Sequence, residues 1–280
     1  MLPVLLKLPN FQIYTFGVFL TLAFLWGAFW FWRNIKLTSY KEQDMFDALF
    51  ASLFGALFFS RLIFVVLNFS EFGASPLKFV LINGFPGMSA VGAFVGGFIT
   101  LFFYVRYKNK SFLELVDYAI PPLFLALVIG KIGSFLAGVD VGIQTSFVLS
   151  TKVLGHEGAR HITALYEAMG FVLGFVLAHK MLFAVRRERM PRGSTFYFFM
   201  VYVSLVTLLL DNLKENHLYF ADFSFNLLTA VVFGLAGSLY FIIIYRSLLR
   251  QKLSRLFSKR YGRKNKLGKS EKIQSKPKGG

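Results

Sequence analysis

The sequence contains no cysteine, which excludes disulfide bonds, thiolate metal ligands and a cysteine nucleophile belonging to the chain itself. Charged residues are also scarce, at 16% of the chain against about 25% in a typical soluble domain. The N-terminus lacks the basic region, short apolar core and small-residue cleavage site of a secretory signal, so we expect its first apolar segment to be retained. What the chain does have is apolar surface: 56% of its residues are hydrophobic and 36 are phenylalanine, which indicates a membrane protein with several spans.

Seven apolar segments divide the sequence, and each approaches the roughly 20 residues that a helix needs to cross a bilayer. They cover residues 11–32, 46–69, 86–105, 113–137, 162–184, 194–213 and 222–245. We therefore predict an all-α polytopic membrane protein with seven transmembrane helices, whose membrane domain comprises residues 1–245.

Basic residues alternate along the chain in a way that predicts the topology. Of the 31 Lys and Arg residues, 24 lie in four stretches: 33–45, 105–112, 180–193 and 246–280. The opposite connections, 1–10, 70–85, 138–161 and 214–221, carry five, and the remaining two, Arg61 and Lys131, lie inside apolar segments. By the positive-inside rule the N-terminus is expected outside and the C-terminus in the cytoplasm, which an odd number of spans also requires.

The tail formed by residues 246–280 holds thirteen of these basic residues. From Gly262 onward it has almost no apolar residues, so we predict that it is disordered. Basic residues beside a span gain about 1 kcal/mol each from an anionic leaflet. No aromatic stacking platform or nucleic-acid-binding module accompanies the charge, so we expect a membrane surface rather than nucleic acid as its partner.

Ionisable residues inside the apolar segments are the first candidates for function, because a charge at a helix centre costs at least about 2.5–3.5 kcal/mol. They are Arg61, Asp117, Lys131, Glu167 and Asp211. Asp117 precedes Pro121 by four residues and is expected mainly to satisfy backbone groups freed by that proline. Glu167 has two possible roles: it interacts with the N-terminus of its helix, or it is a functional acid. Arg61 and Lys131 have no anion nearby in sequence, which favours an anionic ligand such as a lipid phosphate.

Two glycine-rich stretches surround these charges: GMSAVGAFVGG at 87–97 and GKIGSFLAG at 130–138. Gly92 and Gly96 lie four residues apart, on one face of a helix, which permits close helix packing. The glycines around Lys131 permit either tight packing or close approach of the backbone to a headgroup. Both interpretations stay open.

Several motifs, taken in order, resemble those of the prolipoprotein diacylglyceryl transferase family. They are FSR at 59–61, GMSAVGAFVGG at 87–97, Asp117 with Pro121, GKIGSFLAGVD at 130–140 and RHITALYE at 160–167. The resemblance covers roughly residues 11–245. It implies transfer of diacylglyceryl from phosphatidylglycerol, or another anionic phospholipid, to the lipobox cysteine thiol of a prolipoprotein signal peptide. It also implies a monomer in the bacterial plasma membrane that needs no cofactor and no metal.

The resemblance assigns a headgroup-binding set to this chain. Its members are Arg61, Ser89, Gly130, Lys131, Gly133, Ser134, Arg160, Tyr166 and Asp211. The family's reactive histidine aligns with Val91, and one of its arginines aligns with Thr207. The signature arginine is Lys131, which keeps the charge but lacks the bidentate fork of arginine.

These departures leave the chemistry open between two accounts. In the first the chain is an active transferase in which His161, Glu167 or Asp140 supplies the missing catalytic group. Among these, a histidine exchanges protons most readily near neutral pH. In the second the chain is a catalytically degenerate protein that binds lipid or lipoprotein. A small-solute transporter ranks last, because inverted repeats and paired broken helices are missing.

Overall fold

The structure is a computed structural model, which describes residues 2–8, 12–81, 84–85, 87–153, 155–215, 217–220 and 223–246. The tail predicted to be disordered therefore lies, apart from Arg246, outside the described residues. Seven helices in this part of the chain are long and apolar enough to span a membrane, as predicted. They are α1 (Thr15–Ile35), α2 (Glu42–Leu67), α5 (Ala90–Tyr107), α6 (Phe112–Ala137), α7 (Thr163–Arg186), α8 (Ser194–Leu210) continued by the 3₁₀ turn η1 (Asp211–Leu213), and a last span, Phe225–Arg246.

Short elements that the sequence did not predict occupy the connections. Two short helices, α3 (Phe69–Phe72) and α4 (Pro76–Val80), follow α2. Three antiparallel hairpins pair β1 (Val4–Lys7) with β2 (Gln12–Tyr14), β3 (Ser150–Lys152) with β4 (Ala159–His161), and β5 (Tyr219–Phe220) with β6 (Phe223–Ser224). The fold is mostly helical, and these small pieces cover one end of it.

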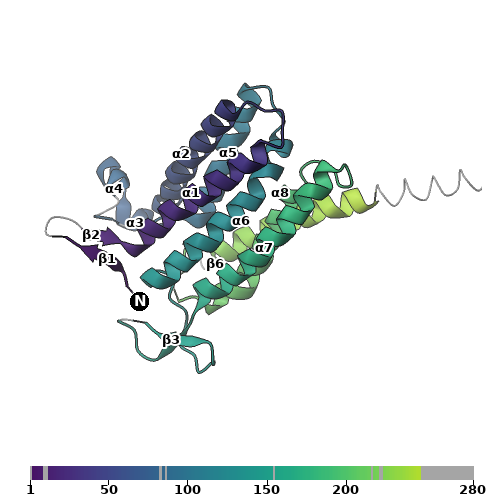
Figure 1. Cartoon of the computed structure of the whole chain (residues 1–280). Helices are drawn as coiled ribbons and strands as arrows, with labels where there is room; N and C mark the ends of the chain where they lie inside the picture. Colours follow the sequence, from purple (N-terminus) through teal and green to yellow (C-terminus); the bar gives the residue numbers. More distant parts are fainter. Residues whose placement is uncertain are drawn as a thin grey trace, which may run out of the picture.

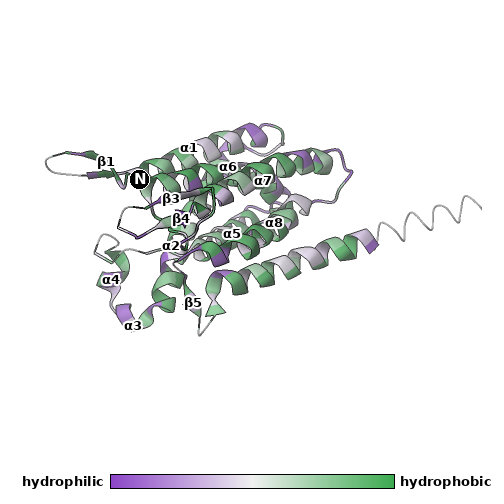
Figure 2. Ribbon diagram, turned by 90° about the horizontal axis from the view of Figure 1, so that it is seen from below, coloured by the Kyte–Doolittle hydropathy of each residue, from purple (hydrophilic) through white to green (hydrophobic). Residues whose placement is uncertain are grey.

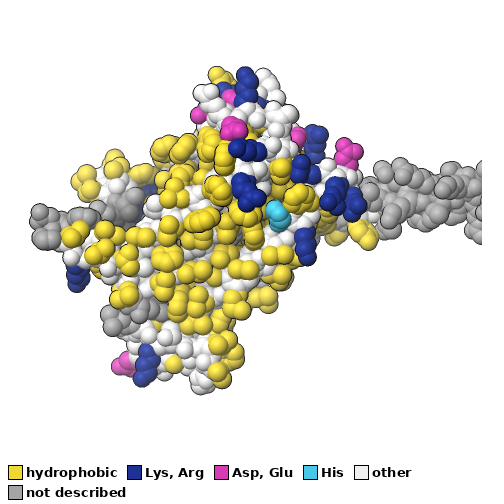
Figure 3. All heavy atoms as spheres, viewed as in Figure 1, with side chains coloured by type: hydrophobic (Ala, Val, Ile, Leu, Met, Phe, Trp, Pro, Cys, Tyr) yellow, Lys and Arg dark blue, Asp and Glu magenta, His cyan; other side chains and the backbone are white. Residues whose placement is uncertain are grey.

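The bundle has two different ends (Figure 1). The hairpins, α3 and α4 lie at one, which we call the hairpin end. The α1–α2, α5–α6 and α7–α8 connections and the end of the last span lie at the other, the basic end. Hydrophobic residues cover most of the helices between them (Figure 2). In the space-filling view an apolar surface fills the middle of one face, and Lys and Arg side chains gather toward the basic end (Figure 3). That the basic end faces the cytoplasm rests on this charge asymmetry and stays a prediction.

Close helix packing accounts for most of the glycines predicted to matter. The helix α6 lies against α1, α7 and α8, while α2 pairs with α5. A side chain at Gly92 would place its Cβ 2.6 Å from the Phe59 carbonyl oxygen, and one at Gly133 would collide with Phe19. Real Cβ atoms do not approach so closely, so these positions on α5 and α6 need glycine for helices to meet. Gly130 has no such neighbour within 4 Å.

Asp117 has a structural role, but not the one expected from Pro121. Its carboxylate accepts hydrogen bonds from the backbone N–H groups of Gly193, Thr195 and Phe196, at 2.5, 2.9 and 3.1 Å. These amides lie at the start of α8, where the first N–H groups of a helix lack partners within it. A buried side chain of α6 therefore caps α8, and the prediction that it serves backbone freed by proline is wrong.

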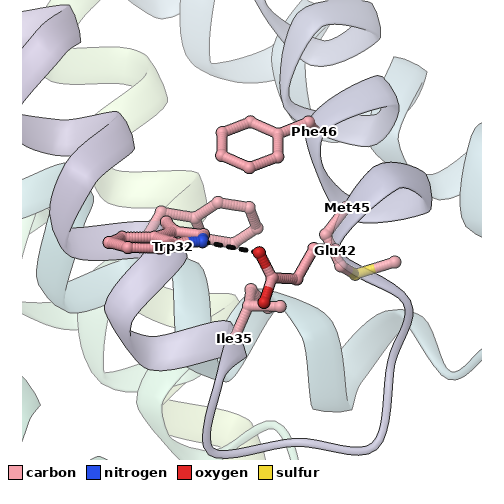
Figure 4. Close-up of a pocket in the computed structure, with 6 residues that line it drawn as sticks. Trp32, Ile35, Glu42, Met45 and Phe46 are labelled. Atoms are coloured by element: carbon pink, nitrogen blue, oxygen red, sulfur yellow. Dashed lines mark hydrogen bonds between the residues drawn. The ribbon is translucent and has the colours of Figure 1, made fainter.

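A second polar contact closes the connection between α1 and α2 at the basic end. The indole Nε1 of Trp32 donates a 2.7 Å hydrogen bond to Oε2 of Glu42 across a small pocket (Figure 4). The other side chains of this pocket are apolar: Phe31, Ile35, Met45 and Phe46. The contact joins two helix ends and lies at the opposite end from the charged residues described next.

Candidate functional site

Lys131 lies near the hairpin end of α6 and has two carboxylate partners. Its Nζ is 2.5 Å from Oε2 of Glu167 on α7 and 2.7 Å from Oδ2 of Asp140, just beyond α6. Lys131 was expected to await an anionic ligand because no anion is close to it in sequence, but the fold supplies two protein carboxylates instead. The partners were missed because one comes from another helix and the other from the loop that turns back over the end of α6.

Glu167 is the centre of this cluster. Its side chain is 5% exposed, and its second oxygen, Oε1, lies 2.7 Å from Nζ of Lys214, the residue after η1. One carboxylate therefore bridges two lysines that come from α6 and from the end of the sixth span. The sequence interpretation of Glu167 as a partner of a helix N-terminus does not describe these contacts.

Backbone pairing brings Lys214 to this position. Gly142 forms a bridge with Lys214, the N–H of Ile143 donates to the Leu213 carbonyl, and the N–H of Glu215 donates to the Val141 carbonyl. The segment after α6 and the segment after α8 thus run side by side in antiparallel fashion. Four separate parts of the chain assemble the cluster, two of which are short connections.

Asp211 anchors the far side of the cluster and is fully buried. It accepts hydrogen bonds from the Ser224 hydroxyl at 2.9 Å and from Nδ2 of Asn226 at 3.3 Å. Nδ1 of His217 lies 3.2 Å from its Oδ2, and Nε2 of His217 lies 3.0 Å from the Lys214 carbonyl oxygen. The sequence analysis did not identify His217, Ser224 or Asn226 as part of this cluster. The one indication in the sequence was that His217 follows Asp211, an acid in an apolar segment, by six residues.

The charges in the cluster are closely balanced. Asp140, Glu167 and Asp211 face Lys131 and Lys214, with His217 at the edge. Burial alone would raise the pKa of the Asp140 carboxyl, but the neighbouring Lys131 ammonium outweighs burial and holds that pKa below its usual range. Asp140 is therefore a carboxylate at neutral pH. An anionic headgroup arriving here meets two ammonium groups that already have carboxylate partners.

The RHITALYE motif fixes the loop above the cluster. Nη1 of Arg160 donates to the Gly142 carbonyl at 3.2 Å and to Oε2 of Glu215 at 2.8 Å. The Tyr166 hydroxyl donates to the Leu149 carbonyl. Both side chains thus tie the segment between α6 and α7 to its surroundings, which is a structural use of residues expected to bind a headgroup.

His161 is the member of that motif with unused hydrogen-bonding capacity. Its Nδ1 is buried and has no hydrogen-bond partner among the described residues. The rings of Phe147 and Tyr166 are its neighbours, each with its centroid 6.1 Å from that of His161. A histidine in this setting can exchange a proton with a group that enters beside it.

Arg61, the second cation predicted to hold a phosphate, is occupied by backbone. The residue is 3% exposed, and its guanidinium donates to the carbonyl oxygens of Lys78, Phe79 and Gly87, at 2.8, 2.9 and 2.8 Å. It therefore fastens the connection containing α4 onto α2. Among the described residues no hydrogen bond or ion pair joins it to Lys131, so joint binding of one headgroup by the two cations stays a prediction.

The remaining predicted residues divide between packing and possible ligand contact. Ser89 is buried and caps α5, since its hydroxyl accepts from an amide in the first turn of that helix. Gly133 packs against α1, as described above. Ser134 is buried one turn from Lys131, and Gly130 adjoins open space. Val91 and Thr207, which stand where the related family has a histidine and an arginine, offer no ionisable side chain.

These observations define a polytopic membrane protein with a buried cluster of acids and lysines at one end of its helices. The chain belongs to the prolipoprotein diacylglyceryl transferase family, whose model matches residues 3–243. The resemblance noted in the sequence motifs is thereby confirmed.

Three relatives show how far the similarity extends. Proteins from Clostridium novyi, Clostridium tetani and Enterococcus faecalis are 23%, 26% and 25% identical over 258, 223 and 253 residues. The aligned regions cover 89%, 77% and 86% of this chain and 97%, 86% and 90% of the relatives. Each relative is named phosphatidylglycerol–prolipoprotein diacylglyceryl transferase. The similarity is low in identity but spans the membrane domain.

Proposed function

We propose that this protein transfers the diacylglyceryl group of phosphatidylglycerol to the lipobox cysteine thiol of a prolipoprotein. The observation that carries the proposal is the family match over residues 3–243, together with the names of relatives aligned over most of their length. The buried cluster at the hairpin end supports it, because charged groups within a membrane protein are costly and commonly mark substrate sites. We place the protein in the bacterial plasma membrane as a monomer, with the hairpin end outside.

The reaction sets the demands on the site. The cysteine sulfur attacks the glyceryl carbon that bears the phosphate, a carbon–sulfur bond forms, and the carbon–oxygen bond breaks. The bonding electrons leave with glycerol phosphate, while the thiol proton passes to a base. Negative charge grows on the leaving oxygen, so a nearby cation stabilises the transition state more than the ground state.

Lys131 and Lys214 are the cations available for this task. Both hold Glu167 between them, and their side chains are 23% and 14% exposed, against 5% for the carboxylate. The two lysine side chains are thus more accessible to an incoming headgroup than the carboxylate that they share. In the proposal, Lys131 contacts the phosphate, and Lys214 adds positive electrostatic potential at the same place. Glu167 and Asp140 hold the Lys131 ammonium in position.

Three side chains are candidates for the base that accepts the thiol proton: Asp140, Glu167 and His161. Asp140 is a weak base because the pKa of its carboxyl is held below the usual range by Lys131. Glu167 already has both carboxylate oxygens next to lysine ammonium groups, so neither oxygen is free to receive the thiol proton. His161 has a ring nitrogen without a partner in the described part of the chain. We therefore assign proton removal from the thiol to His161.

The test is transfer from phosphatidylglycerol to a lipobox peptide in vitro. Wild type, His161→Ala and Val91→His are compared, with unfolding measured for each. The proposal expects activity in wild type and a loss of about 10²–10⁴-fold in His161→Ala, the usual contribution of a general base. Full activity in His161→Ala would refute the assignment of the base.

A second candidate function is lipid or lipoprotein binding without chemistry. The observation that favours it concerns Val91 and Thr207. These residues have no ionisable side chain, whereas the family has a histidine and an arginine at the two positions. A wild-type protein that binds phosphatidylglycerol but transfers nothing, and gains transfer in Val91→His, would establish this alternative.

The topology has a direct test because the natural chain has no cysteine. A cysteine replacing Val148, which is 91% exposed at the hairpin end, should react in intact cells with a maleimide that cannot cross the membrane. A cysteine replacing Lys41, in the α1–α2 connection, should react only after the membrane is broken. The reverse pattern would invert the proposed orientation.

A further inference from the structure

A line of three rings with an arginine at each end joins α1 to α7 at the basic end. The guanidinium of Arg33 lies 4.9 Å from the Trp30 ring, and Trp30 lies 6.3 Å from the ring of His179 on α7. His179 lies 5.0 Å from Phe183, and the guanidinium of Arg186 lies 5.6 Å from the Phe183 ring. We call Arg33, Trp30, His179, Phe183 and Arg186 the arginine–aromatic ladder.

The positive charge of the ladder is not compensated by the protein. Neither Arg33 nor Arg186 has a carboxylate oxygen within 4 Å among the described residues, and both side chains are exposed. Two nearby acids are engaged elsewhere: Asp44 pairs with lysines that follow α5, and Glu114 pairs with Arg192. The α1–α7 face at the basic end therefore presents two guanidinium groups without a carboxylate partner, of which Arg186 also lies within hydrogen-bonding reach of the Tyr118 hydroxyl. A guanidinium can bind phosphate in a bidentate manner.

Two buried polar atoms lie within the same ladder. Nε1 of Trp30 and Nδ1 of His179 have no hydrogen-bond partner in the part of the chain that the structure describes. Such groups are costly inside a membrane unless they are satisfied. Trp30 precedes Arg33 by three residues, about 4.5 Å along the helix axis. A phospholipid whose phosphate lies at Arg33 would place its ester oxygens, and the water that accompanies them, at about the depth of Trp30.

We propose that the ladder is a binding site for an anionic phospholipid in the leaflet at the basic end. The guanidinium groups of Arg33 and Arg186 attract the phosphate, and Trp30 and His179 lie at about the depth of the glycerol ester region. The site lies at the opposite end of the helices from Lys131 and Glu167, and it is independent of the transfer reaction. Basic residues next to the ends of transmembrane helices attract anionic lipids in the same way.

The experiment uses native mass spectrometry of the full chain and, separately, quenching of Trp30 fluorescence. For quenching, Trp26→Phe and Trp32→Phe leave Trp30 as the only tryptophan, and vesicles contain phosphatidylcholine with brominated phosphatidylglycerol or brominated phosphatidylcholine. We expect stronger quenching by the brominated anionic lipid. Arg33→Gln combined with Arg186→Gln should weaken this preference by roughly tenfold, equivalent to about 1.4 kcal/mol.

Arg106→Gln is the matched control, because Arg106 is an exposed basic residue at the same end, on α5, outside the ladder. It should leave the preference unchanged, and mass spectrometry of the unmodified protein should show a retained anionic lipid that the double variant loses. Equal quenching by both brominated lipids, or equal retention in wild type and double variant, would overturn the proposal. Inorganic phosphate should not compete; if it removed the preference, the site would bind free phosphate rather than lipid.

Discussion

Glu167→Gln is the substitution that tests the cluster most directly. Removing one member of a fully buried ion pair costs roughly 3–5 kcal/mol, because the partner charge stays buried. Glu167 contacts both Lys131 and Lys214, but Lys131 keeps Asp140 at 2.7 Å and Lys214 keeps Asp211 at 3.7 Å. The lysines are also partly exposed. We therefore expect the free energy of unfolding to fall by roughly 2–3 kcal/mol, below the full value.

Denaturant-induced unfolding in detergent micelles, followed by intrinsic fluorescence, would measure this difference. Glu157→Gln makes the same chemical change at an exposed position in the β3–β4 connection and should change stability by less than about 0.5 kcal/mol. The two variants together separate the effect of the cluster from that of a glutamate in general. If Glu167→Gln were as stable as wild type, the ion pairs would not hold α6, α7 and the end of the sixth span together.

Three further predictions address packing, capping and pH. Asp117→Asn should lower stability by about 1–3 kcal/mol, since a neutral amide oxygen replaces a carboxylate that accepts from three amides of α8; an unchanged unfolding curve would contradict the cap. Gly92→Ala should destabilise by forcing α5 away from α2, whereas Gly130→Ala, with open space around it, should be nearly neutral; comparable losses would argue against the packing role. Because the pKa of Asp140 is depressed in the folded state, its stabilising contribution is present above its unfolded pKa of about 3.9 and is lost as pH falls through the folded value. Stability measured against pH should therefore fall less steeply in acid for Asp140→Asn than for wild type.

The spans were predictable because each is a long apolar run, and lipid imposes the same requirement on every residue of such a run. Their limits were less predictable. The second segment was expected to begin at 46, yet α2 begins at Glu42. Its first turn is polar and lies outside the apolar run, so hydrophobicity alone does not mark the start of the helix. The third was expected to begin at 86, yet α5 begins at Ala90, where Ser89 provides the cap. Short hairpins leave no comparable signal, since a strand of two to four residues carries little periodicity.

The identities of the buried charges were also predictable, because any ionisable residue in an apolar run is unusual. Their partners were not. Asp140 and Glu167 reach Lys131 only because the chain turns at the end of α6 and returns as α7. The partners of Arg61 are backbone carbonyls, which look the same in every sequence. Contacts of this kind depend on tertiary structure, and no pattern within a single sequence predicts them.

The geometry at Lys131 gives the substitution of lysine for arginine a physical meaning. An ammonium has three N–H donors. One donates to Asp140 at 2.7 Å, and the ammonium also forms an ion pair with Glu167 at 2.5 Å, so at least one donor is left for an incoming oxygen. Lys131 can therefore contact one phosphate oxygen without giving up either carboxylate. A guanidinium in the same place would offer a bidentate grip, so this chain is expected to hold its phosphate more weakly and to depend more on the bilayer to deliver the lipid.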